Sequence, residues 1–250
     1  MRIALISDIH ANAPALRAVH ADIINIGVDQ IFNLGDILYG PLWPRETFDL
    51  LQTISAVTIQ GNQDREIYEA TPSELEKRPI LRFTIQDLRA DGVAWLKALP
   101  KTMLIGDIFL CHGTPQSDMI YLLENVESGE PSVRDNSDIQ TLLDDCRAPV
   151  VVCGHSHTPR LVRLASGQIV ISPGSVGLPA YDDESPVPHR MQSYSPDASY
   201  AILEKTSADW AAVLRRVPYD FVAAVKQARG LGSPGASKWA GWLETGRAHG

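Results

Sequence analysis

The sequence predicts an α/β fold built on two β-sheets, and three observations carry this prediction. Over the first two-thirds of the chain, short apolar strands alternate with helical stretches, a pattern typical of α/β proteins. In the last third, strands follow one another without helices between them, which indicates a second, more antiparallel sheet. The 250 residues are 44% hydrophobic and 21% charged, enough to bury a substantial core. We expect one domain over residues 1–250.

The first two-thirds of the chain consist of apolar strands that mostly lead into helical segments. The expected strands are Arg2–Ser7, Gln30–Leu34, Ala56–Gln60, Lys101–Ile105, Asp107–Cys111 and Val150–Cys153. Asn12 and Pro14 indicate the start of the first helix, which should stop at Gly27. Further helical segments are expected at Arg45–Ile54, Glu66–Leu99 and Ile139–Asp145. Gly106 and Asp107 indicate a hairpin turn between the two strands that flank them.

The last third has a different character. Strands at Leu161–Ala165 and Gln168–Ser172 should form a hairpin, and two more strands are expected at Tyr200–Lys205 and Trp210–Val217. Residues 179–198 are polar and proline-rich, so we expect an inserted loop, and long loops inside compact domains are usually functional or mobile. The tail over residues 230–250 is glycine-rich, but Trp239 and Trp242 are spaced to anchor a short terminal helix.

Composition and charge exclude several classes of function. The net charge of −8 is not offset by a basic run, which argues against a nucleic acid as the main partner, although a small anion can bind where positive charge is local. No apolar stretch approaches the ~18 residues that a membrane span requires. The first residues become polar too early for a signal peptide. Three scattered cysteines, Cys111, Cys146 and Cys153, make no disulfide framework. We therefore expect a cytoplasmic protein.

Polar side chains able to bind metals follow five of the expected strands. They are Asp8 and His10 after Arg2–Ser7, Asp36 after Gln30–Leu34, Asn62 and Asp64 after Ala56–Gln60, His112 after Asp107–Cys111, and His155 and His157 after Val150–Cys153. Sites in α/β folds lie at the carboxyl ends of strands, so these side chains can converge on one crevice. Each motif alone is ordinary turn or helix-cap chemistry, but their recurrence at successive strand ends favours a metal site.

The donor types indicate which metals such a site would take. Apart from Asp64, the set has two carboxylates, one amide oxygen and four imidazoles, which suit borderline or hard divalent ions such as Mn, Fe, Ni and Zn. In an extended segment His155 and His157 would lie on the same side, with Cα atoms about 6–7 Å apart. That spacing is wide for one ion but fits two ions about 3.5–4 Å apart. The sequence therefore predicts two metal ions with one of these histidines on each.

With these motifs in order, the chain resembles the calcineurin-like metallophosphoesterase superfamily, and in particular its small bacterial and archaeal phosphodiesterase-like branch. The blocks of that family are D-x-H, G-D-x-x-x-x-G, G-N-H-[DE], a lone H and G-H-x-H. Here they stand as Asp8-Ile9-His10, "GDILYG", "GNQD", His112 and "GHSH", with "SPGS" and the weaker "RRVPYD" following. The resemblance implies a four-layer α/β/β/α sandwich of two mixed sheets flanked by helices.

The resemblance also implies a role for each residue. One ion would be held by Asp8, His10 and His157, the other by Asn62, His112 and His155, and Asp36 would bridge both. Asp36, Asn62, Gln63 and His112 would form the catalytic set, with Gln63 standing where the family often has a histidine that protonates the leaving group. A neutral amide donates a hydrogen bond but delivers no proton, so general-acid catalysis by this residue is in doubt.

The function expected from this site is metal-dependent hydrolysis of a small phosphate ester by a hydroxide that the two ions activate. Alternatives are a nucleotide or phosphoprotein phosphatase of the same superfamily, a non-catalytic scaffold on the same fold, and a mononuclear or structural metal protein. Candidate substrate contacts are Asp64, Arg65, His189 and Arg190. The last two lie in the loop over residues 179–198, which is interpreted as a solvated insertion, a lid or a dimer contact. A dimer contact would make the protein a homo-oligomer, so this possibility is kept.

Overall fold

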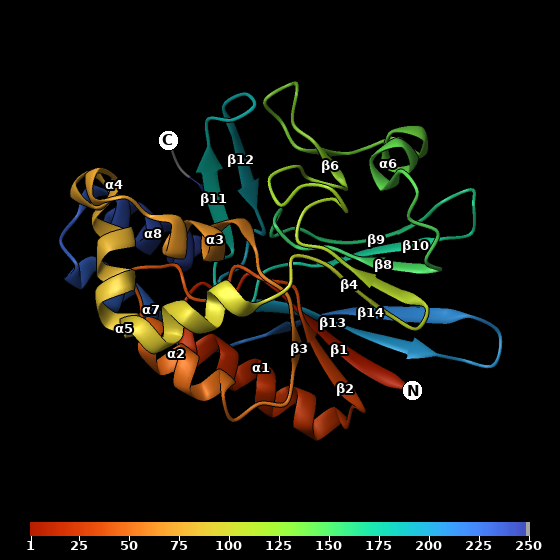
Figure 1. Ribbon diagram of the computed structural model, residues 1–250, viewed down its shortest axis with the longest axis horizontal. Coiled ribbons are helices and arrows are strands. Elements are labelled where there is room, and N and C mark those ends of the chain that lie inside the picture. The colour runs from red at the N-terminus through yellow and green to blue at the C-terminus, as the bar shows by residue number, and fades with distance from the viewer. Residues whose placement is uncertain (249–250) are drawn as a thin grey trace.

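Two five-stranded sheets, stacked face to face, form the centre of the molecule (Figure 1). The computed structural model describes residues 1–248. The first sheet has the order β14-β13-β1-β2-β3, and its strands are Trp210–Val217, Ala198–Lys205, Arg2–Ile6, Gln30–Asn33 and Val57–Thr58. The second has the order β4-β5-β8-β10-β9, and its strands are Met103–Ile105, Ile108–Leu110, Val150–Val152, Ile169–Pro173 and Pro159–Arg163.

Three hydrophobic layers hold these sheets and their helices together. Strand β1 is apolar from Ile3 onward because both of its faces are buried. Ile3 and Leu5 pack between the sheets, whereas Ala4 and Ile6 pack against the helices on the outer face. On the far side of the second sheet, Val151 packs against the helix α6 (Asn136–Leu143). The expected arrangement of two mixed sheets flanked by helices is therefore confirmed.

Most helices cover the first sheet, at the lower left of Figure 1. They are α1 (Ala13–Ile26), α2 (Pro44–Leu51), α5 (Pro79–Ala98), α7 (Phe221–Gly230) and α8 (Pro234–Thr245). The Asn12 side chain accepts the Ala15 N–H at 3.2 Å and caps α1 as expected. The helical region expected over Glu66–Leu99 is three helices, because Pro72 and Pro79 each start a new one: α3 (Asn62–Glu69), α4 (Pro72–Lys77) and α5. The predicted terminal helix is α8; the last two residues of the predicted tail, 249–250, lie outside the described residues.

Two sequence-based expectations about the last third are wrong. Strands β13 and β14 do not join the second sheet: β13 runs antiparallel beside β1, with Leu5 opposite Ala201, and β14 continues that sheet. Residues 179–198 are not one continuous loop. Within them β11 (Ala180–Asp183) and β12 (His189–Gln192) form an antiparallel hairpin, in which the apolar Ala180 and Met191 are buried. A similar small pair, β6 (Glu124–Asn125) and β7 (Ser132–Val133), was not predicted.

The strand directions place one edge of both sheets at a common crevice. Strands β1, β2 and β3 are parallel, and so are β5, β8 and β10 in the other sheet. Their carboxyl ends lead into the loops that carry the expected metal ligands. Within residues 1–248, no helix is both long enough and apolar enough to cross a bilayer.

Candidate metal centre

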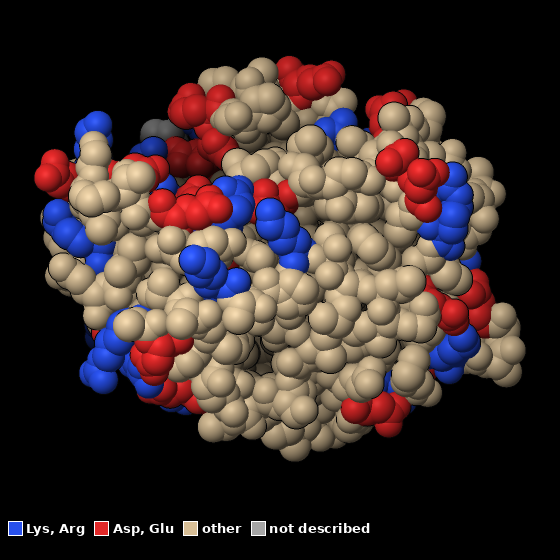
Figure 2. Space-filling model, in the orientation of Figure 1, with Lys and Arg blue, Asp and Glu red and all other residues tan. Residues whose placement is uncertain are grey.

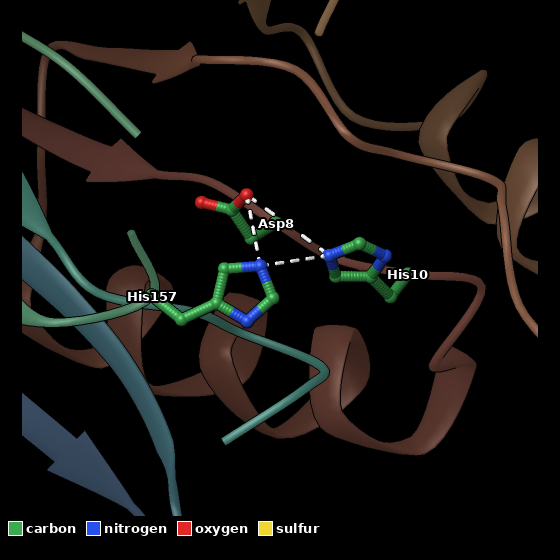
Figure 3. A group of neighbouring side chains, drawn as sticks. All are labelled: Asp8, His10 and His157. Atoms are coloured by element: carbon green, nitrogen blue, oxygen red, sulfur yellow. Dashed lines mark hydrogen bonds and ion pairs between the residues drawn. The ribbon is translucent and has the colours of Figure 1, made fainter. Parts of the chain in front are cut away.

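Six of the seven expected ligands come together in the crevice as two neighbouring groups, and the seventh, Asn62, lies beside the second. Asp8, His10 and His157 form the first group, and Asp36, His112 and His155 form the second; within each, one ligand atom per residue lies within 4.8 Å of the others. All six side chains are buried. Figure 3 shows the carboxylate of Asp8 and the rings of His10 and His157 pointing toward one another.

Asp8 lies between the two groups. Its Oδ2 accepts the backbone N–H of His155 at 3.2 Å. Its Oδ1 is buried without a hydrogen-bond partner among the described residues. This free oxygen is 3.3 Å from Nε2 of His157 and 4.0 Å from Nε2 of both His10 and His112. A buried carboxylate oxygen without a partner is costly, and a cation placed among these atoms would satisfy it.

Backbone carbonyls fix the orientation of three histidine rings. The Nδ1 atoms of His10, His112 and His157 face the carbonyl oxygens of Tyr39, Leu34 and Leu178 at 3.2, 2.7 and 2.6 Å. Each Nδ1 therefore donates to its carbonyl, and each Nε2 points into the crevice. Nε2 of His10 and Nε2 of His157 are only 3.0 Å apart, so two lone pairs face each other. This arrangement fits a shared metal ion, which removes the repulsion.

The second group is completed by the start of helix α3. Asn62, its first residue, places Oδ1 3.0 Å from Nε2 of His112. Asp36 Oδ2 is 3.4 Å from the same nitrogen, while its Oδ1 accepts the Gln63 backbone N–H at 2.9 Å. One oxygen of Asp36 thus binds a helix N-terminus, which keeps the other turned toward the ligands.

Burial and neighbouring charge determine how these groups ionise. Burial lowers the pKa of His10 and of His155 to about 4, with a neighbouring histidine adding to the effect in each case, so both stay neutral near pH 7. Burial acts against a cationic His112, but the adjacent Asp36 carboxylate outweighs it and raises the pKa of His112 to about 10. Burial likewise opposes ionisation of Asp36, yet His112 keeps its pKa below the usual range. The site therefore holds anionic carboxylates that attract positive charge.

Backbone strain is concentrated in the ligand loops. Nine non-glycine residues of the described chain have positive φ, and five of them are the candidate ligands Asp8, His10, Asp36, His155 and His157. Such conformations cost roughly 1–3 kcal/mol each and persist where the surrounding structure enforces them, most often at functional sites. Gly61 shows how tightly the loops are packed: an added Cβ would lie 2.2 Å from Oδ1 of Asp36. The strain supports a functional rather than a structural role for these turns.

The His-x-His segment reaches both groups by a different geometry from the one expected. The segment is not extended, because His155 and His157 have φ values of 68° and 56°. The bend still sends one histidine to each group, His155 toward Asp36 and His157 toward Asp8. The prediction of one histidine per group agrees with this arrangement, but the extended backbone from which it was derived is wrong.

Two of the expected substrate contacts, Asp64 and Arg65, are occupied within the protein. Asp64 is fully buried, and its two oxygens accept the backbone N–H groups of Ile37 and Gly61 at 2.9 and 3.0 Å. It joins two ligand loops and is not available to a substrate. Burial, together with the charge of Asp36, raises the pKa of Asp64 to about 7. Arg65 makes a two-pronged ion pair with Asp118, at 2.8 and 3.0 Å.

The other two expected contacts also lie away from the ligands. His189 is buried, its Nδ1 faces the Val187 carbonyl at 2.7 Å, and its Nε2 accepts from the Tyr121 hydroxyl at 3.0 Å. Arg190 is exposed on β12 and borders a separate depression, which is also lined by Asp182 and Asp183. The region that carries them, expected to be an inserted loop, contains the β11–β12 hairpin, which packs beside the ligands.

Sequence reasoning missed the aromatic residues around the ligands. A cavity of about 170 Å³, partly open to solvent, lies over the two groups and is walled by Tyr39, Tyr181, Trp239 and Trp242. The Trp239 ring meets His10 edge-on with centroids 5.5 Å apart, and Tyr181 meets His157 at 4.6 Å. The spacing of the two tryptophans identified a helix, but nothing local in the sequence places that helix at the site.

Comparison with solved structures agrees with this geometry. A metallophosphoesterase from Sphaerobacter thermophilus superposes with a TM-score of 0.75 and 28% sequence identity, covering 98% of this chain and 99% of the other. A hypothetical protein from Pyrococcus horikoshii OT3 has the same fold, with a TM-score of 0.74, 19% identity and 98% of both chains covered. The fold is therefore that of the metallophosphoesterases.

Sequence comparison defines the family. The calcineurin-like phosphoesterase superfamily domain matches residues 1–193, so the chain belongs to this superfamily of hydrolases. An uncharacterised protein from Methanocaldococcus jannaschii is 28% identical over 200 residues, which cover 71% of this chain and 76% of that protein. The matched region contains all seven candidate ligands but ends before β13, β14, α7 and α8.

Proposed function

We propose that the protein hydrolyses phosphate esters with the help of two divalent metal ions. The observation that carries this proposal is the pair of donor groups whose bare nitrogens and unpartnered carboxylate oxygen face one another in a buried crevice. A scaffold protein has no need to retain so many converging, strained ligands. A single ion would leave one of the two groups idle.

In this proposal Asp8, His10 and His157 hold one ion, Asn62, His112 and His155 hold the other, and Asp36 bridges them. Two divalent ions, when bound, supply positive charge for the phosphate and lower the pKa of a water molecule toward neutrality. Two carboxylates cancel only two of four positive charges, so the centre keeps about +2 for an anionic substrate.

The protein's own contribution is to orient the donors and to keep His10 and His155 neutral. The carbonyls of Tyr39, Leu34 and Leu178 hold three imidazoles in the tautomer that binds a cation. Gln63 faces the cavity and has no proton to give, so no general acid is assigned to this position. We infer that hydrolysis depends on leaving groups that are stable as anions.

The metal identity, the substrate class, the cellular location and the oligomeric state are proposed from the sequence. The ions are Mn, Fe, Ni or Zn, as the mixed nitrogen and oxygen donors suggest. The substrate is a small phosphate ester, and the acidic composition argues against nucleic acid. We propose that the protein is cytoplasmic and that it forms a homo-oligomer.

Two measurements test the proposed function. Elemental analysis after loading with Mn should find two ions per chain, and a screen of phosphomonoesters, phosphodiesters and nucleotides should show turnover that a chelator abolishes. Two bound ions without turnover on any ester would favour the scaffold alternative. One tightly bound ion at saturation would contradict the dinuclear centre.

A further inference from the structure

We propose that the outer part of this cavity selects phosphate esters whose organic group is apolar and uncharged, and discriminates against esters that carry a second anionic group. This inference rests on the proposed function and specifies its substrate class. The evidence for this inference is the charge of the side chains that line the cavity and the position of the strands and helices that carry them.

The residues that line the cavity include no lysine or arginine within the described chain. Beyond the metal ligands, the charged side chains in the lining are Asp182 and Asp183, which end strand β11. Figure 2 shows acidic side chains over the upper part of the molecule, where Figure 1 places the β11–β12 hairpin. A phosphate group can thus find positive charge at the metal ions, but a second anion farther out meets carboxylates.

One cation reduces this negative charge without removing it. Lys238 of helix α8 pairs with Asp182, with Nζ 2.7 Å from Oδ2. Asp183 accepts the Ser185 N–H at 3.0 Å and has no ion-pair partner among residues 1–248. We call Asp182, Asp183 and Lys238 the rim of the cavity, and together they carry about one net negative charge. This charge acts on any charged group that extends beyond the metal ions.

The rest of the wall suits an apolar group. Tyr39, Leu178, Trp239 and Trp242 face the cavity with little of their surface exposed, whereas Met119 is 51% exposed at its edge. An uncharged aromatic or aliphatic group that enters would cover Met119 and the exposed edges of the rings, and burial of apolar surface is favourable. No cationic side chain compensates an anionic group in the same place.

Two aromatic residues of this wall lie outside the superfamily match. The match ends at residue 193, whereas Trp239 and Trp242 belong to α8. The metal ligands therefore lie within the matched region, whereas helix α8, which supplies part of the wall, lies outside it.

A pair of diesters with the same leaving group tests the inference. p-Nitrophenyl phenyl phosphate and p-nitrophenyl 4-carboxyphenyl phosphate differ only in one carboxylate on the retained arm, so p-nitrophenolate departs from both. We expect kcat/KM to be about tenfold higher for the phenyl ester, on the order expected for charges a few ångströms apart at a solvated rim. Binding of benzylphosphonate and 4-carboxybenzylphosphonate to the metal-loaded protein, measured by calorimetry, should show the same preference without hydrolysis.

Variants on the two sides of the rim should move this ratio in opposite directions. Asp183→Asn removes one carboxylate and should lower the preference about threefold, while Lys238→Gln frees Asp182 and should raise it about threefold. Asp107→Asn removes the same charge at the opposite end of the second sheet, before β5, and should leave the ratio unchanged. Metal content, measured for each variant, shows whether the centre is intact.

The outcomes separate this inference from the proposed function. Equal kcat/KM values and equal affinities for the two members of each pair would overturn the inference, as would a ratio that neither rim variant changes. Turnover of both esters at equal rates would leave the proposed function standing. Binding that discriminates against the carboxylate, without turnover of any ester, would support the charged rim and contradict the hydrolase.

Discussion

The floor and the wall of the cavity are built in different ways. The floor consists of short turns at strand ends, where ligand side chains stand on strained backbone and are fixed by hydrogen bonds to nearby loops. The wall comes from the β11–β12 hairpin and helix α8, which contact the ligands mainly through aromatic rings. The floor lies entirely within the superfamily match, and helix α8 lies outside it.

This difference indicates a division of labour. A metal centre tolerates little displacement of its donors, so the backbone that carries them is held even at a cost in strain. The wall has only to provide a surface of suitable shape and charge, and side-chain packing is enough for that. Changes in the floor should therefore alter metal binding and chemistry, whereas changes in the wall should alter which substrate is accepted.

The largest effect is expected from the floor, at Asp36. Asp36→Asn keeps an oxygen that can accept the Gln63 N–H but removes the negative charge between the two groups. Losing the second ion should remove several kcal/mol of transition-state stabilisation, which corresponds to a decrease in kcat/KM of about 10³-fold. Elemental analysis should show fewer than two ions per chain. Asp107→Asn, far from the site, is the isosteric control, and full occupancy in Asp36→Asn would contradict the bridging role.

A smaller effect is expected at Gln63, where the floor meets the cavity. Without a proton donor here, the rate should depend steeply on the pKa of the leaving group, so aryl esters should react far faster than alkyl esters. Gln63→His should help the poorest leaving groups most, by about 10²-fold, at the lower end of what general acids provide. Rates over a series of leaving groups measure this slope. A shallow slope in the unmodified protein would mean that another group supplies the proton.

The floor could be predicted from the sequence because each of its residues stands in a short, recognisable sequence pattern. Asp8, Asp36, Asn62 and His112 each follow a short apolar strand, and parallel strands bring their carboxyl ends to one edge. The wall could not be predicted, because Trp239 reaches His10 only through the packing of helices distant in sequence. The hairpin was missed for a related reason: prolines and charges in residues 179–198 indicate a loop, while the apolar Ala180 and Met191 that anchor the pairing are few.

Asp64 tests whether the floor depends on its internal connections. Asp64→Asn keeps one acceptor but turns an N–H toward a backbone N–H, either at Ile37 or at Gly61. Leaving a buried donor unpaired should cost about 1–3 kcal/mol in the free energy of unfolding, measured with denaturant in the presence of a chelator. Asp118→Asn, in a partly exposed ion pair with Arg65, should cost about 1 kcal/mol or less. Equal losses for the two variants would argue against a special role for Asp64.

Tyr181 is the residue through which the wall acts on the floor. Its hydroxyl lies 3.0 Å from the carbonyl oxygen of His155 and 2.9 Å from the hydroxyl of Tyr121, whose ring stacks on the imidazole of His155 at 4.6 Å. Because His189 accepts the Tyr121 O–H, the Tyr181 hydroxyl donates toward the His155 carbonyl or toward Tyr121.

Tyr181→Phe keeps the ring against His157 and removes only this hydroxyl, so the hairpin should still form. We expect the affinity for the ion at the second group to fall about tenfold, within the range known for residues that orient metal ligands, while the first group keeps its ion. Metal titration by calorimetry resolves the two steps. Tyr194→Phe, on a ring that is 65% exposed, is the matched control. An unchanged second step would show that the floor holds His155 without help from the wall, and equal weakening of both steps would mean that the hairpin supports the whole centre.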